Sequence, residues 1–188
     1  MLGELYRGPE AITSVAMAED GRAALTASSI RQLDGGVETR HAIVRRWDLA
    51  VRREVKAAGD RPYLDFSGRP EAVWAAIEAP GNAGVLTIGG NGASLWSGGD
   101  VARPEVVFKP HGGITSASFS SSGQHVVTGS SDRRAKVWNV ASGLAELQLP
   151  AEHTRPITSI EYSPVDENLL VTTSADGTAR PFTAAASA

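Results

Sequence analysis

Residues 111–140 read HGGITSASFSSSGQHVVTGSSDRRAKVWNV. Polar and apolar residues alternate over residues 114–120, a β-branched run covers residues 124–129, and a third run over residues 135–139 contains Trp138. Short segments rich in Ser, Gly and Asp separate the three runs, at residues 121–123 and 131–133. Alternation at period two between such segments predicts three short β-strands joined by tight turns.

The same pattern occurs four times along the chain. The aromatic residues that end the third strand lie 49, 42 and 44 residues apart, and they are Trp47, Trp96, Trp138 and Phe182. The first strand begins with Ile-Thr-Ser at residues 12–14, 114–116 and 157–159, and a looser version covers residues 73–76. A period near this length predicts repeated units that bury their faces against one another.

A repeat of this length that carries Trp-Asp or a relative resembles the WD-repeat β-propeller family. The resemblance spans about residues 4–182 and is strongest in the last two repeats. It implies an all-β fold, a β-propeller built of four-stranded antiparallel blades with strands a to d, and four such blades in this chain. It also implies that the loops on one face bind other proteins.

The blade boundaries follow from the repeat. We expect one unit over residues 1–188: blade 1 at about 11–57 with an inserted b–c loop at 29–43, blade 2 at about 72–109, blade 3 at about 113–150, and blade 4 at about 156–183. Blade 4 has room for strands a to c only, whereas residues 3–7 form a strand d that precedes the first repeat. We expect this offset N-terminal strand to complete a last blade.

The resemblance further implies a hydrogen-bonded network in each well-formed blade. Its members are a His from the d–a loop, a Ser or Thr from strand b, an Asp from the b–c turn and the Trp of strand c. The matching positions are His111, Ser130, Asp132 and Trp138 in the third repeat, His153, Ser174 and Asp176 in the fourth, Trp96 with Asn91 in the second, and Trp47 in the first. Phe182 replaces the fourth indole and has no N–H to donate.

Candidate partner-binding residues lie where the b–c turns and d–a loops meet. The inserted segment 29–43 is either a tolerated surface loop or a contact loop, and Trp74 is either core between blades or a contact aromatic. The full set is Arg31, Asp34, Glu38, Arg40, His41, Trp74, Gly113, Ser131 and Arg155.

Catalytic interpretations are weaker than structural ones. His111, Asp132 and Ser130 have the residue types of a hydrolytic triad, but the same set recurs in the fourth repeat, which favours a structural role. The glycine-rich segment 89–94 lacks the Lys-Ser/Thr ending of a phosphate loop and matches a turn. We expect no metal site and no cofactor.

Composition limits the remaining classes. The chain has 188 residues, no cysteine and a net charge of −3, which excludes disulfides and zinc–thiolate sites and disfavours nucleic-acid binding. No signal peptide and no apolar run of membrane-spanning length occur, so we expect no membrane association and an intracellular, cytoplasmic location.

The sequence therefore predicts a non-catalytic scaffold for protein–protein interaction. A truncated unit with a structural role and a hydrolase built on Asp34, Glu38 and His41 are the alternatives. Four blades are at the low end of the number that closes a propeller ring. Two chains closing an eight-bladed ring, a partial chain completed by other blades, and a closed four-bladed monomer all stay open.

Overall fold

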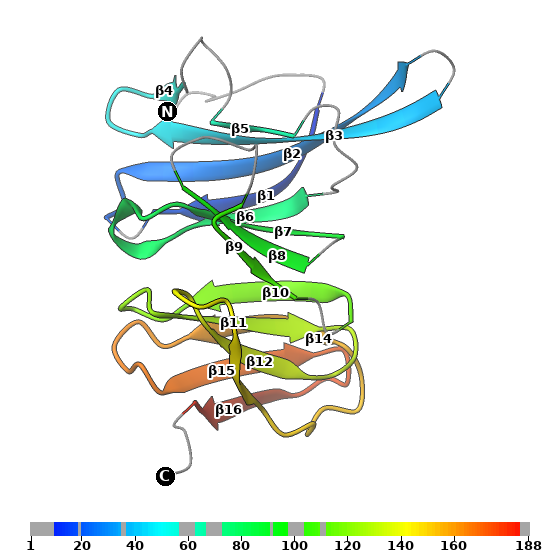
Figure 1. Ribbon diagram of the computed structural model, residues 1–188, viewed down its shortest axis with the longest axis vertical. Helices are drawn as coiled ribbons and strands as arrows, with labels where there is room; N and C mark the ends of the chain where they lie inside the picture. The colour runs from blue at the N-terminus through cyan, green and yellow to red at the C-terminus, as the bar shows by residue number, and fades with distance from the viewer. Residues whose placement is uncertain are drawn as a thin grey trace.

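The computed structural model describes residues 10–18, 20–34, 37–56, 63–66, 73–90, 92–97, 104–109 and 112–184, and for residues 30–34, 37–41, 65 and 82 it describes the backbone alone. In these ranges the chain is all-β apart from one 3-10 turn, Pro80–Asn82. Four antiparallel sheets succeed one another along the chain and are stacked along the longest axis (Figure 1). These sheets are the predicted blades.

Within each blade the strands pair in chain order, except that β5 of blade 1 pairs with β3. Blade 1 contains β1 (Ala11–Met17), β2 (Ala23–Asp34), β3 (Val37–Asp48), β4 (Arg53–Val55) and β5 (Leu64–Asp65). Blade 2 contains β6 (Val73–Glu78), β7 (Val85–Gly89), β8 (Gly92–Trp96) and β9 (Val106–Phe108). Blade 3 contains β10 (Ile114–Phe119), β11 (His125–Ser130), β12 (Ala135–Asn139) and β13 (Ala145–Gln148). Blade 4 contains β14 (Ile157–Tyr162), β15 (Leu169–Ser174) and β16 (Ala179–Thr183).

One irregularity recurs in all four blades. The pairing of strand a with strand b shifts register directly after the first apolar residue of strand a, between Ile12 and Ser14, and at the equivalent places in β6, β10 and β14. A β-bulge of this kind bends the strand and increases its twist. Its recurrence shows that the sequence repeat is also a repeat of backbone geometry.

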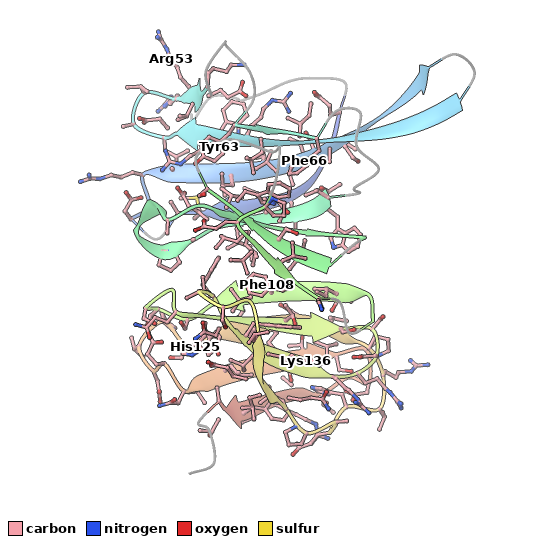
Figure 2. The ribbon with its side chains drawn as sticks, viewed as in Figure 1. Arg53, Tyr63, Phe66, Phe108, His125 and Lys136 are labelled. Atoms are coloured by element: carbon pink, nitrogen blue, oxygen red, sulfur yellow. The ribbon has the colours of Figure 1, made fainter. Side chains whose placement is uncertain are left out.

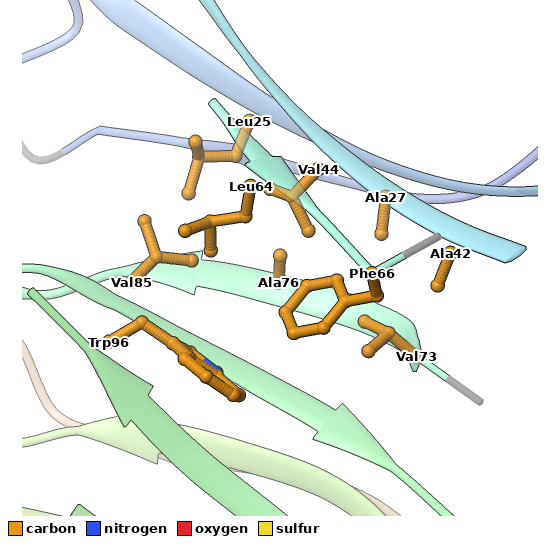
Figure 3. Packing of buried hydrophobic residues seen from close by; sticks show 10 residues of the cluster. All are labelled: Leu25, Ala27, Ala42, Val44, Leu64, Phe66, Val73, Ala76, Val85 and Trp96. Carbon is orange, nitrogen blue, oxygen red and sulfur yellow. The ribbon is translucent and has the colours of Figure 1, made fainter. Parts of the chain in front are cut away.

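Three hydrophobic clusters each lie between neighbouring blades. In the first, Leu25 and Val44 of blade 1 pack over Ala76 and Val85 of blade 2, with Phe66 edge-on to Trp96 at 5.0 Å between ring centroids (Figure 3). In the second, Phe108 lies at the boundary of blades 2 and 3 (Figure 2). Each fully buried aliphatic side chain stabilises the stack by about 1.5–3 kcal/mol.

Every blade between two others therefore has two covered faces. We call the face that packs on the preceding blade the incoming face, and the face that packs on the following blade the outgoing face. The first strands of the blades lie along a shared cavity of about 440 Å³, lined by segments 14–17, 75–77 and 115–118 together with Ile88 and Glu161.

The structure corrects the prediction for the insertion in blade 1. Residues 29–43 were expected to form a loop, but β2 and β3 continue through this segment with unbroken register from Ala23↔Asp48 to Asp34↔Val37. A two-residue Gly-Gly connection between extended segments is typical of a β-hairpin. The segment is thus a two-stranded ribbon that extends beyond the blade, as Figure 1 shows for β2 and β3.

Two further points concern the limits of the blades. The short strand β5, which pairs with β3, was not predicted. The expected strand at residues 3–7, together with Asn91 and His111, lies outside the described residues. Within the described ranges, no helix has the length and hydropathy that crossing a membrane requires.

Candidate functional site

A tryptophan–threonine hydrogen bond links strands b and c in each of the first three blades. The indole Nε1–H of Trp138 donates to Thr128 Oγ1 at 2.8 Å. Trp96 donates to Thr87 at 2.8 Å, and Trp47 donates to Thr26 at 3.0 Å. Because buried indole N–H groups need an acceptor, each pair satisfies a donor that would otherwise destabilise the blade.

These threonines are a feature that the sequence reasoning missed. The network was expected to use Ser130 and Ser174 as its strand-b hydroxyls, but the contacts to the ring nitrogens come from Thr128 and Thr172. The signal was present in the sequence, because a threonine occupies the same place of strand b in every repeat: Thr26, Thr87, Thr128 and Thr172.

Ser130 and Ser174 help to shape the turns. The backbone N–H of Asp132 donates to Ser130 Oγ at 3.2 Å, and that of Asp176 donates to Ser174 Oγ at 3.1 Å. Each aspartate also accepts the backbone N–H two residues further on, at 2.9 Å in both turns. Such local side-chain contacts are what favour Ser and Asp in tight turns.

Blade 4 joins its strands through His153, which is 4% exposed. Its Nε2 lies 2.6 Å from Thr172 Oγ1 and its Nδ1 lies 3.1 Å from Asp176 Oδ2. In the neutral ring the carboxylate favours the proton on Nδ1, which leaves Nε2 to accept the threonine hydroxyl. The predicted grouping of His153 with Asp176 is therefore present, with Phe182 beside the ring at 6.5 Å between centroids.

The carboxylate of Asp176 is held in its charged form. The hydroxyl of Thr178 donates to it at 2.6 Å, and the backbone N–H of Thr154 donates at 3.0 Å. The Thr178 hydroxyl and these further hydrogen bonds hold the pKa of Asp176 well below its usual range, against the opposing effect of burial.

Hydrogen bonds join the d–a loops to the b–c turns. In blade 3 the N–H of Ser131 donates to the Gly113 carbonyl at 2.9 Å, and the N–H of Gly113 donates back to Ser131 Oγ at 3.2 Å. In blade 4 Ser174 Oγ donates to the Arg155 carbonyl at 3.0 Å. The structure therefore brings Gly113, Ser131 and Arg155 to the edge where both kinds of loop meet, and we call it the loop edge.

A close backbone contact fixes this edge in blade 3. Gly112 has φ +116°, and a Cβ placed there would lie 2.6 Å from Ser130 Oγ. Only glycine fits this combination of backbone angle and close approach without displacing the turn. The d–a loop is thus pressed directly against the b–c turn.

The ribbon of blade 1 extends from the same edge. Strands β2, β7, β11 and β15 run in the same direction in Figure 1, so their b–c connections lie along one side of the stack. The backbone positions of the predicted contact residues in the insertion all fall on this ribbon, and they are Arg31, Asp34, Glu38, Arg40 and His41.

The hydrolase hypothesis finds no support in the register of the ribbon. His41 pairs with Ile30, whereas Asp34 pairs with Val37 at the far end. Four residues of extended strand separate Ile30 from Asp34, which is about 13 Å at the usual rise per residue. The backbone therefore does not bring these positions together as a catalytic pair requires.

Trp74 lies at the bulge of β6, at the end of that strand nearest the loop edge. It is 36% exposed, so it is not enclosed between blades as core. This exposure contradicts the core interpretation of Trp74, and the contact interpretation stays a prediction.

Comparisons with known proteins agree with this architecture. The family model for the WD domain, G-beta repeat, matches residues 102–139 and 146–180. The periodic tryptophan protein 2 homolog of Dictyostelium discoideum is 36% identical over 70 residues, which is 37% of this chain and 8% of that protein. The DENN domain and WD repeat-containing protein SCD1 of Arabidopsis thaliana is 32% identical over 140 residues, which is 73% of this chain and 11% of that protein.

Solved structures share the fold. A chain of the computationally designed Ika4 protein aligns with a TM-score of 0.66 at 20% identity, covering 97% of this chain and 99% of that one. A chain of the Mitotic Checkpoint Complex aligns with a TM-score of 0.69 at 13% identity, covering 95% of this chain and 49% of that one.

The chain spans about a tenth of the length of the curated relatives described above. WD-repeat proteins generally act as scaffolds for protein interaction. The family-model matches and the WD-repeat relatives show that the chain carries WD repeats, and its four stacked blades show the β-propeller fold.

Proposed function

We propose that this chain is a non-catalytic scaffold that binds other proteins through its loop edge. The observation that carries the proposal is the joining of d–a loops to b–c turns in consecutive blades, which presents Ser131 and Arg155 on a rigid frame. Binding sites held on rigid elements lose little conformational entropy when a partner docks.

The ribbon and Trp74 extend this surface. The ribbon adds two strands that reach beyond the blades, and Trp74 adds an aromatic of the type enriched at interfaces. The cysteine-free composition supports an intracellular setting. In this proposal two chains share one ring of eight blades.

The test is quantitative capture of partners by variants of the loop edge. We expect Arg155→Ala combined with Trp74→Ala to reduce recovery of a specific partner at least about tenfold, because aromatic and arginine side chains dominate interface energetics. Val165 is 91% exposed and lies in the a–b turn of blade 4, away from the loop edge, so Val165→Ala is the matched control.

The control should retain the partner at the level of the unmodified chain. Equal losses in the control and in the double variant would contradict the proposal, as would a complete absence of specific partners. Deletion of residues 31–40 with a Gly-Gly closure tests the ribbon separately, because the remaining register of β2 and β3 is unchanged.

A further inference from the structure

Every blade that follows another buries the same positions of its first strand. The first of these positions is 2–5% exposed and the second is 0–3% exposed. In blades 2, 3 and 4 the first position is Val73, Ile114 and Ile157, and the second is Ala76, Ala117 and Ile160. All six belong to the clusters that join consecutive blades, so they form the incoming faces.

Blade 1 leaves these positions uncovered. Ile12 and Val15 occupy the first and second positions and are 52% and 70% exposed. Met17, equivalent to the buried Tyr162 of blade 4, is 58% exposed. Burial of apolar side chains of this size stabilises a protein or an assembly, and here three of them are exposed together on one strand.

Blade 4 leaves the opposite face uncovered. Leu25, Leu86 and Val127 form the outgoing faces of blades 1, 2 and 3 and are each 0% exposed. Their equivalent in blade 4 is Val171, which is 42% exposed, and Ala179 is exposed although its equivalent Ala135 is buried.

One uncovered face is an incoming face and the other is an outgoing face, and these are the two kinds of face that pack together between neighbouring blades. Ile160 and Val127 lie in one buried cluster between blades 3 and 4, and Val15 and Val171 are the equivalents of these two residues. The chain therefore carries both halves of a contact that it already makes three times internally. Blades 1 and 4 lie at opposite ends of the longest axis in Figure 1, so one chain does not bring its own halves together.

We infer that the outgoing face of blade 4 packs on the incoming face of blade 1 of a second copy. This inference rests on the proposed function in its two-chain form. Two copies make this contact twice, which uses both free faces of each chain and closes a ring. The contact continues the internal stacking without a new type of interface. The occupant of each terminal face is thus the other terminal face of a partner copy.

The first measurement is the mass of the 188-residue chain in solution by sedimentation equilibrium over a wide concentration range. We expect a discrete species of twice the chain mass of 19.7 kDa. A monomer at every concentration would overturn the inference. An open series of larger species would overturn it as well, because it would show that two copies do not close.

Charge substitutions test the direction of the contact. We expect Val15→Lys and Val171→Glu each to raise the dimer dissociation constant at least about a hundredfold, because each buries an unpaired charge. Mixing the two variants should restore the dimer, since one interface is then unmodified and the other pairs Lys with Glu. Val107→Glu, at a position that is 48% exposed on β9, is the matched control and should leave the mass unchanged.

A contact between two copies of blade 1 would give a different pattern. Val15→Lys would then abolish the dimer while Val171→Glu would leave it intact, and that result would overturn the inference. Thermal unfolding of each variant establishes that the blades are folded. An unmodified chain that forms the dimer but captures no specific partner would count against the proposed function alone.

Discussion

Blades 3 and 4 have the same turn and the same strand-b hydroxyl but differ at the aromatic of strand c, which is Trp138 in blade 3 and Phe182 in blade 4. In blade 3 the hydroxyl of Thr128 accepts the indole N–H of Trp138 from the neighbouring strand. In blade 4 the hydroxyl of Thr172 contacts His153, which comes from the loop before the blade and also contacts Asp176.

The repeat preserves some contacts in both blades and varies others. The position of the threonine and the hydrogen bonds of the turn are common to both blades, whereas only the strand-c aromatic of blade 3 has an N–H to donate to the threonine. An indole keeps its N–H at every accessible pH, but the contact of Asp176 with His153 depends on the carboxylate staying charged. Blade 4 therefore holds a contact that depends on the carboxylate of Asp176 staying charged.

The largest expected effect comes from replacing the ring in blade 3. Trp138 is 4% exposed and stacks edge-on with Phe108 at 5.9 Å between centroids. Trp138→Phe should lower the free energy of unfolding by about 2–3 kcal/mol, because it leaves a cavity and removes the donor to Thr128. Urea denaturation measures the change.

The matched substitution in blade 4 is Phe182→Leu. Phe182 is half-buried at the open end of the stack, so the free energy of unfolding should fall by about 1 kcal/mol or less. Equal losses at the two positions would show that the blades do not differ in how they hold strand c.

A smaller effect is expected from removing the hydroxyls. Thr128→Val should lower the free energy of unfolding by about 1–3 kcal/mol, because the buried indole N–H of Trp138 loses this acceptor. Thr172→Val should cost only about 1 kcal/mol, because His153 keeps its contact with Asp176. Chemical denaturation measures both, and Thr158→Val on the exposed face of β14 is the control, expected within about 0.5 kcal/mol of the parent chain.

A larger loss at Thr172 than at Thr128 would reverse the comparison. It would mean that the hydroxyl contact, and not the carboxylate, holds the imidazole in place.

The smallest effect is the acid response of blade 4. Hydrogen bonds lower the pKa of Asp176 in the folded state, so its contribution to stability is present above the unfolded value near 4. That contribution is lost as the pH falls from about 4 through the folded pKa. We expect the free energy of unfolding to decline in this window, and the decline to be shallower in Asp176→Asn.

Denaturation midpoints measured from pH 6 down to pH 2 give the slope of the free energy of unfolding against pH. An identical slope in the variant and the parent chain would mean that Asp176 does not carry the acid response.

The repeat made most of the fold predictable from sequence. Strand order followed from the spacing of the repeat and its turn residues, and the grouping of His153 with Asp176 followed from the resemblance to WD repeats. Thr128 was missed because a threonine within a β-branched run reads as an ordinary strand residue, and its hydrogen bond depends on which side chains share a face across two strands. The ribbon was missed because length alone suggested a loop, whereas the register of Ile30 with His41 shows paired strands.

The positions of the uncovered faces could be located from sequence, but the exposure of their side chains could not. Val15 and Ile160 have similar residue types at equivalent places, and only the stacking order decides that one is 70% exposed and the other is 0% exposed. Burial is a property of neighbours in space, which the repeat specifies for inner blades and leaves open for terminal ones.

The most direct test of the account is the exchange of the four indole N–H protons with solvent, followed by NMR. Trp47, Trp96 and Trp138 donate to threonines and are 3–4% exposed, whereas Trp74 is 36% exposed. The account predicts three slowly exchanging indole signals and one rapidly exchanging signal that disappears in Trp74→Phe. Fewer than three protected signals, or protection of Trp74, would contradict the claim that a tryptophan–threonine pair fixes each of the first three blades.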